Sequence, residues 1–157
     1  MRPGDVLLIE GTTFESKIIQ WITKSKFTHM CIVVAENKVI EATANFLRLD
    51  MGNVRISPLL KYAKNKAVVL RPQLSTCQRK TLLRVALSKV GKAYDNFGIL
   101  LIALKMLFPI NIPRPRNKYN CTSFICEILK TLGLRVNYHL PQQFLANKNF
   151  EIIMPTT

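Results

Sequence analysis

Short apolar runs separated by polar turns fill the first half of the chain, and this pattern predicts β-strands. Residues 29–34 (HMCIVV) are apolar at successive positions, as in a central strand that is buried on both faces. Residues 38–43 (KVIEAT) follow after a short turn and predict a hairpin with them. Further strands are predicted at residues 4–10, 53–57, 66–72 and 150–154.

Apolar residues at helical spacing predict three main helices. The first covers residues 12–25, where Thr12 and Glu15 have the spacing of a capping box. The second begins after Ser75 and ends at Gly91, and the third covers residues 121–133. The stripe of the first helix consists of Phe14, Ile18, Trp21 and Ile22.

Two shorter helices are predicted from proline positions. Ser57 and Pro58 read as the cap and first residue of one, and Pro141 opens the other. The strands come mainly before the helices, which predicts an α+β fold in a single domain over residues 1–157.

The most apolar stretch, residues 97–112, is too short to cross a bilayer and is interrupted by Lys105 and Pro109. It leaves two readings open: a buried core helix, or a wall or lid for an acyl chain. In the second reading, three basic residues that follow it would contact a phosphate group or a membrane surface. These residues are Arg114, Arg116 and Lys118.

The balance of 23 basic against 9 acidic residues gives a formal charge of +14, which favours anionic partners. Aromatic residues do not interleave with the basic ones, so we expect an anionic membrane or lipid rather than nucleic acid. Neither a signal peptide nor a transmembrane run is recognised, and we expect a cytoplasmic protein that can contact a membrane peripherally.

The four cysteines form no CxxC pair, and His29 and His139 lack the paired spacing of zinc ligands. We therefore expect free thiols, no metal and no cofactor. Cys121 stands out because Asn120 precedes it as a helix cap, and the first turn of a helix lowers the pKa of a thiol. Packing is the commoner role of an isolated cysteine, so the residue alone leaves both readings open.

A thiolate nucleophile needs a base, and histidine is the usual one. His29 begins a predicted strand, whereas His139 lies in a loop and is the weaker candidate. Glu41, on the strand paired with that of His29, would orient the imidazole. Cys126 lies well inside its helix and is assigned to packing.

Four motifs resemble those of NlpC-like papain-fold cysteine peptidases. Residues 119–125 (YNCTSFI) resemble the nucleophile motif, and residues 28–43 resemble the hairpin that carries the histidine. Residues 2–10 resemble the Pro-Gly-Asp strand, and residues 90–98 (VGKAYDNFG) the Tyr-Asp segment. In the parent family the tyrosine and cysteine segments come first, so the order here resembles the circularly permuted, YiiX-like branch, which has bacterial, phage and poxvirus members.

The resemblance implies a permuted papain-like fold in which an antiparallel sheet packs against the helix of the nucleophile. It implies Cys121 as the nucleophile, His29 as the base and Glu41 as the third member. Tyr94 would line the site and hydrogen-bond the oxyanion, and Asp5 would be mainly structural. Residues 97–118 are then an apolar and basic insert between the tyrosine and cysteine motifs.

The chain departs from the family motif at two positions beside the nucleophile, where Asn120 replaces an aspartate and Ser123 a glycine. We expect a cysteine hydrolase or acyltransferase acting on an amide or ester of a peptide, isopeptide or lipid. The alternative is a noncatalytic basic module that binds anionic membrane or nucleic acid.

Overall fold

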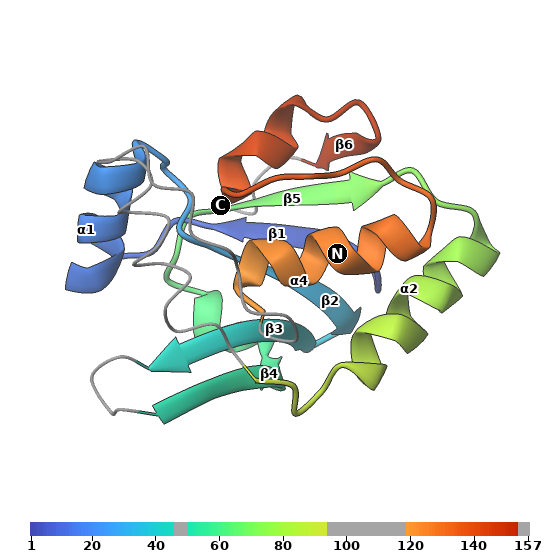
Figure 1. Ribbon diagram of the computed structural model, residues 1–157, viewed down its shortest axis with the longest axis horizontal. Helices are drawn as coiled ribbons and strands as arrows, with labels where there is room; N and C mark the ends of the chain where they lie inside the picture. Colours follow the sequence, from blue (N-terminus) through green and yellow to red (C-terminus); the bar gives the residue numbers. More distant parts are fainter. Residues whose placement is uncertain (46–49, 94–118, 154–157) are drawn as a thin grey trace.

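A six-stranded antiparallel sheet forms the centre of the protein (Figure 1). The computed structural model describes residues 1–45, 50–93 and 119–153. The strands are β1 (Val6–Ile9), β2 (His29–Ala35), β3 (Lys38–Asn45), β4 (Asp50–Pro58), β5 (Ala67–Pro72) and β6 (Phe150–Ile153). Their order across the sheet is β4-β3-β2-β1-β5-β6, which places β2 in the interior, as its continuous apolar sequence predicts.

In the part of the chain that the structure describes, three α-helices and two 3₁₀ turns accompany the sheet. They are α1 (Phe14–Thr23), α2 (Thr76–Ser88), α4 (Cys121–Thr131), η2 (Leu59–Tyr62) and η3 (Pro141–Ala146). The predicted α+β class is confirmed, as are the hairpin of β2 with β3 and the helix that begins after Ser75.

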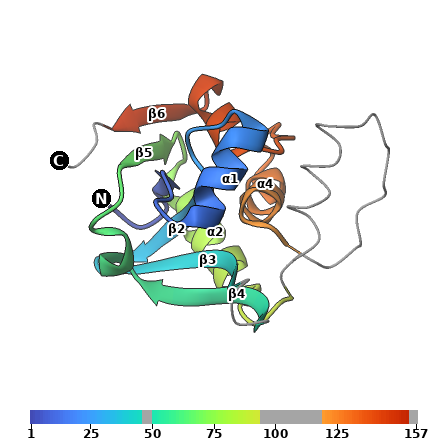
Figure 2. The same cartoon turned by 90° about the vertical axis from the view of Figure 1, so that its left-hand side faces the viewer.

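The two faces of the sheet are covered differently (Figure 2). Alternate residues of β1 and β2, such as Leu8 and Met30, pack in the main core with Phe124 and Ile128 of α4. The intervening positions form a smaller apolar cluster that η2 covers. This cluster comprises Leu7, Ile9, Cys31, Val33 and Val39, with Leu59, Tyr62 and Ala67 packed against it.

The prediction for the start of α1 is wrong by one residue, and its stripe faces outward. Thr13, rather than Thr12, is the N-cap, and its hydroxyl accepts the N–H of Ser16 at 3.2 Å. Phe14 and Trp21 are about four-fifths exposed, at 78% and 80%. Helical spacing had identified a shared face, but spacing alone does not say which face a protein buries.

The short helix predicted at Ser57 is also placed differently. Ser57 and Pro58 still belong to β4, where they pair with Val39 and Lys38, and the helix is a single 3₁₀ turn that begins at Leu59. The serine hydroxyl does not cap this turn, because it donates to Glu41 instead. A local capping signal was therefore overridden by strand pairing and a tertiary hydrogen bond.

Candidate active site

Cys121 is the first residue of α4, where the sequence predicts it. The Asn120 side chain accepts the N–H of Ser123 at 2.7 Å, and the Ser123 hydroxyl accepts the N–H of Asn120 at 3.0 Å. This reciprocal pair is a capping box that fixes the first turn of the helix. The two departures from the family motif therefore act together, since each supplies one half of the cap.

The thiol lies where a negative charge is favoured. The first N–H groups of a helix have no partner within it, and they give this end a partial positive charge. Asn120, the cap residue, accepts two of these N–H groups: that of Ser123 with its side-chain oxygen, and that of Phe124 with its backbone carbonyl. The N–H groups of Cys121 and Thr122 are not used by the cap.

His29 is the first residue of β2, and its backbone is fixed by the preceding residue. The N–H of Thr28 donates to the carbonyl of Ile9 at 3.1 Å, and the Thr28 hydroxyl accepts the N–H of Gly11 at 3.2 Å. The side chain of His29 is 19% exposed, so solvent can reach the imidazole. Cys121 itself is only 8% exposed.

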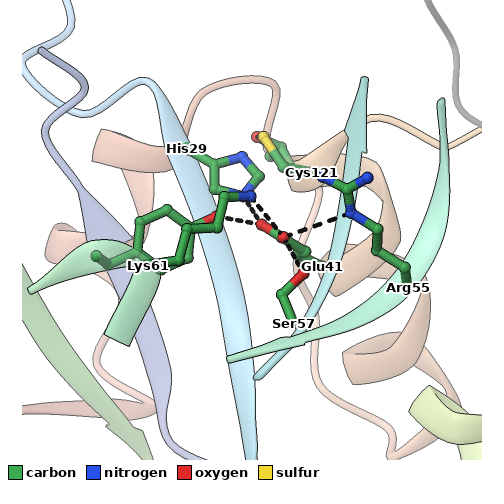
Figure 3. Close-up of polar contacts among 8 residues, drawn as sticks. His29, Glu41, Arg55, Ser57, Lys61 and Cys121 are labelled. Carbon is green, nitrogen blue, oxygen red and sulfur yellow. Dashed lines mark hydrogen bonds and ion pairs between the residues drawn. The ribbon is translucent and has the colours of Figure 1, made fainter. Parts of the chain in front are cut away.

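Glu41 lies on β3 with no exposed side-chain surface, and it accepts a hydrogen bond from the imidazole (Figure 3). The distance from Nε2 of His29 to Oε2 of Glu41 is 2.8 Å. Because Nε2 is engaged in this way, Nδ1 is the ring nitrogen left for the sulfur of Cys121. The three residues come from α4, β2 and β3, and the fold brings all of them together.

Three residues that the sequence reading missed hold the carboxylate of Glu41. The Ser57 hydroxyl donates to Oε1 at 2.6 Å, the Lys61 ammonium donates to the same oxygen at 2.8 Å, and the Tyr62 hydroxyl donates to Oε2. Arg55, directly opposite Glu41 on β4, lies farther away at 3.8 Å. The sequence holds one signal that could have suggested these partners of Glu41. Polar residues cluster around 55–62, next to a strand that is predicted to pair with the strand of Glu41.

The pKa shifts of His29, Cys121 and Glu41 all favour the charged forms of these groups. Burial favours a neutral imidazole, but hydrogen bonds to Cys121 and Glu41 outweigh it and raise the pKa of His29 to about 9. Burial likewise opposes a thiolate, yet the hydrogen bond and charge of His29 hold the pKa of Cys121 below its ordinary value. Burial would raise the pKa of Glu41, but His29, Lys61 and Ser57 together lower it.

These shifts favour an ion pair between a thiolate and an imidazolium. Each of its members favours the charged form of the other, and the ionised carboxylate of Glu41 stabilises the imidazolium from the opposite side. The burial of Tyr62 beside Glu41 raises the pKa of its phenol, so this hydroxyl remains a hydrogen-bond donor. The arrangement suits nucleophilic attack by sulfur followed by proton donation from nitrogen.

Of the other residues singled out in the sequence, the structure describes Asp5 but not Tyr94 or the residues of the insert. Tyr94, Arg114, Arg116 and Lys118 lie outside the described residues, as does the apolar stretch 97–112. Asp5 is fully buried and is bonded by Arg71 through Nε at 3.0 Å and Nη2 at 2.9 Å. This pair ties β1 to β5, the structural role that the resemblance implies.

The fold matches a solved structure over nearly its whole length. The crystal structure of the metalloprotein yiiX from Escherichia coli O157:H7 superposes with a TM-score of 0.73 and 19% sequence identity, covering 99% of this chain and 97% of that chain. No protein-family model and no curated protein sequence matches the chain. The expected YiiX-like architecture is thus confirmed at the level of the fold, and the permuted papain-like assignment stays a prediction.

The description of that protein as a metalloprotein raises the question of whether this site fits a metal. Within residues 1–45, 50–93 and 119–153, no three His, Cys, Asp or Glu side chains are grouped to hold one. Both oxygens of Glu41 already accept hydrogen bonds, and the Lys61 ammonium lies 2.8 Å from one of them. The described residues of the site therefore do not fit a bound cation.

In the part of the chain that the structure describes, no helix has the length and apolar composition needed to cross a bilayer.

Proposed function

We propose that the protein is a cysteine hydrolase or acyltransferase that forms an acyl-enzyme on Cys121 from an amide or ester substrate. The observation that carries this proposal is that the imidazole of His29 is hydrogen-bonded both to the thiol of Cys121, at the capped start of a helix, and to the buried carboxylate of Glu41. A buried carboxylate that orients a histidine, which in turn activates a nucleophile, is the arrangement used for acyl transfer on unrelated folds.

In the first step, the thiolate of Cys121 attacks the acyl carbon and forms a carbon–sulfur bond. The negative charge then moves to the carbonyl oxygen, where the N–H groups of Cys121 and Thr122, which the cap does not use, can donate hydrogen bonds. The intermediate collapses when the imidazolium of His29 gives its proton to the leaving amine or alcohol. The carbon–nitrogen bond of the amide or the carbon–oxygen bond of the ester breaks, and the products are the released amine or alcohol, a thioester on Cys121 and a neutral imidazole.

In the second step, the neutral imidazole of His29 takes a proton from water or from another acceptor as the acceptor attacks the thioester. Water releases a free acid and regenerates the thiolate and imidazolium, whereas an amine or alcohol acceptor gives acyl transfer. Glu41 keeps Nε2 of the ring occupied throughout and stabilises the imidazolium each time it forms.

The proposal extends to the class of substrate, for which an anionic molecule is favoured. Amides and esters pass through the same tetrahedral intermediate, so peptides, isopeptides and lipids are all substrates that this machinery can process. The formal charge of +14 and the basic residues Arg114, Arg116 and Lys118 favour an anionic substrate, such as a phospholipid. Tyr94 is proposed as an additional oxyanion donor.

The test is to incubate the protein with a panel of acylated peptides and phospholipids, quench it with acid, and measure the mass added to each cysteine. We expect one acyl group on Cys121, absent in Cys121→Ala and strongly reduced in His29→Ala. Cys77→Ser is the matched control, because Cys77 is the exposed thiol and its loss should leave the adduct unchanged. Equal labelling of wild type and Cys121→Ala would contradict the proposal and favour the noncatalytic binding module.

A further inference from the structure

Helix α1 exposes an apolar stripe that the rest of the described fold does not use. Phe14 is 78% exposed, Ile18 43% and Trp21 80%. These residues are spaced i, i+4 and i+7, so they lie along one face of the helix. Figure 1 shows α1 at one end of the molecule, beyond the sheet.

The opposite side of α1 is fastened to the protein, which keeps the stripe facing outward. Thr23, on that side, is buried at 8% exposure, and Phe27, in the segment that follows the helix, is buried at 6%. The side-chain amide of Gln20 donates to the carbonyls of Gly11 at 3.0 Å and of Lys26 at 3.2 Å, and so ties the helix to the segments on both sides of it. The exposed apolar face is therefore presented by a fixed helix.

Basic side chains border the stripe. Lys17 lies one turn before Trp21 and is exposed, and Lys24 is exposed at the C-cap. Lys26 follows, with a side chain that is 64% exposed and only a distant contact, 3.8 Å, to Glu10. An aromatic and aliphatic face with lysines at its border is the pattern of a helix that lies in the interface of an anionic bilayer.

The charge of the chain distinguishes among the partners that could cover this face. A second copy of the protein would bring another +14 charges, which opposes self-association. Several of the nine acidic residues are already bonded to basic ones, including Asp5 by Arg71 and Glu127 by Lys89. Single-stranded nucleic acid binds best where its bases can stack on successive aromatic side chains. Here the aliphatic Ile18 lies between Phe14 and Trp21, so the stripe offers no continuous stacking surface.

We propose that α1 docks the protein on an anionic lipid bilayer, with Phe14, Ile18 and Trp21 inserted into the interface and Lys17 and Lys24 against the headgroups. Residues 25–28 alone connect the C-cap of α1 to His29, so this contact would hold the candidate active site close to the membrane surface. The proposal does not depend on the chemistry of Cys121, and its test measures binding without any measurement of activity.

Trp21 is the only tryptophan of the chain and therefore reports directly on its own environment. The experiment adds vesicles of phosphatidylcholine mixed with phosphatidylserine, or of phosphatidylcholine alone, and follows tryptophan emission and co-sedimentation. We expect a blue shift and binding with the mixed vesicles, and binding weaker by about tenfold or more with the neutral ones. Brominated acyl chains should quench the emission of bound wild-type protein, which requires no variant.

The double variant Phe14→Ser/Ile18→Ser keeps the reporter and should bind mixed vesicles at least about tenfold more weakly, because two large apolar side chains are lost. Lys17→Gln should weaken binding by about fivefold and reduce its salt dependence. Ile152→Ser is the matched control, since Ile152 is an exposed apolar residue (54%) on β6, and it should bind like wild type.

Three results would overturn the proposal. One is the absence of a blue shift with anionic vesicles, and another is unchanged binding by a folded Phe14→Ser/Ile18→Ser protein. The third is quenching of Trp21 by a single-stranded oligonucleotide that binds more tightly than the vesicles, which would assign the surface to nucleic acid instead.

Discussion

The imidazole of His29 and the carboxylate of Glu41 are joined between neighbouring strands of the sheet, Nε2 to Oε2, at 2.8 Å. The carboxylate has no exposed surface; Ser57 and Lys61 donate to its other oxygen, Oε1, and Tyr62 donates to Oε2. A buried and ionised group in this position fixes the orientation of the ring and favours its protonated form. Glu41 is thus the residue through which the surrounding fold acts on the thiol of Cys121.

Glu41→Gln should therefore affect both stability and reactivity. The amide can still form a hydrogen bond, but the charge that raises the pKa of His29 is lost, so we expect the pKa of His29 to fall and that of Cys121 to rise. Loss of the buried charge-assisted bonds should lower the free energy of unfolding by about 1–3 kcal/mol. Urea unfolding and NMR titration of the imidazole measure the two effects.

The control for this variant is Ser57→Ala, which removes one hydrogen bond from Glu41 and leaves its charge in place. Its shift in the pKa of His29 should be the smaller of the two. An equal shift in both variants would show that packing around the carboxylate, rather than its charge, sets the protonation of the ring.

Asp5→Asn should destabilise the protein without changing the site. Asp5 is buried and its carboxylate receives two hydrogen bonds from Arg71, so removing the charge should cost about 3 kcal/mol. Asp5 is not among the main causes of the pKa shifts of His29 and Cys121. We expect a lower melting temperature with an unchanged pH profile for alkylation of Cys121; a changed profile would link the two clusters.

The capping box predicts a coupling between two residues that flank the nucleophile. Asn120→Ala should lower the free energy of unfolding by about 1 kcal/mol, as loss of a helix cap usually does. Ser123→Ala removes the reciprocal bond, and the double variant should cost less than the sum of the two single ones because the bonds support each other. Strict additivity in chemical denaturation would show that the two halves act independently.

The stability of the fold should depend on pH through His29. Its pKa in the folded protein, about 9, is above the ordinary 6.5, so its contribution is complete below pH 6.5 and is lost as the pH rises through 9. Glu41 acts in the opposite sense: its pKa is lowered, so its contribution is present above the ordinary 4.5 and is lost as the pH falls below it. The lowered pKa of Cys121 acts in the opposite sense to that of His29, so the comparison is made in a Cys121→Ser background. There, the free energy of unfolding measured in urea should fall between about pH 6 and about pH 10 by more than it does when His29→Gln is added.

The central residues could be anticipated from the sequence because each depends on local signals. An asparagine before a helical pattern predicts the cap that precedes Cys121. A short turn between two apolar runs predicts the hairpin that brings His29 near Glu41, since paired strands align their side chains. These local signals placed the residues in their helix and strands, whereas the resemblance to the NlpC-like motifs predicted that the three form one cluster.

The residues around Glu41 and the orientation of α1 could not be predicted in the same way. Ser57 stands before a proline, which is a common helix start, and only the register of β4 with β3 shows that its hydroxyl faces Glu41. The spacing of Phe14 and Trp21 gives a common face but carries no information about which face packs inward. Both depend on contacts between segments far apart in the chain.

The central claim is that His29 holds Cys121 as a thiolate. It is tested most directly by the rate at which iodoacetamide alkylates Cys121 as a function of pH, in a Cys77→Ser background and with Cys121 followed by peptide mass. We expect rapid alkylation already at pH values below the ordinary thiol pKa of 9.0, and a change in rate near pH 9, where His29 loses its proton, with both features absent in His29→Gln. A single rise at the pKa of an ordinary thiol, identical with and without His29, would contradict the account.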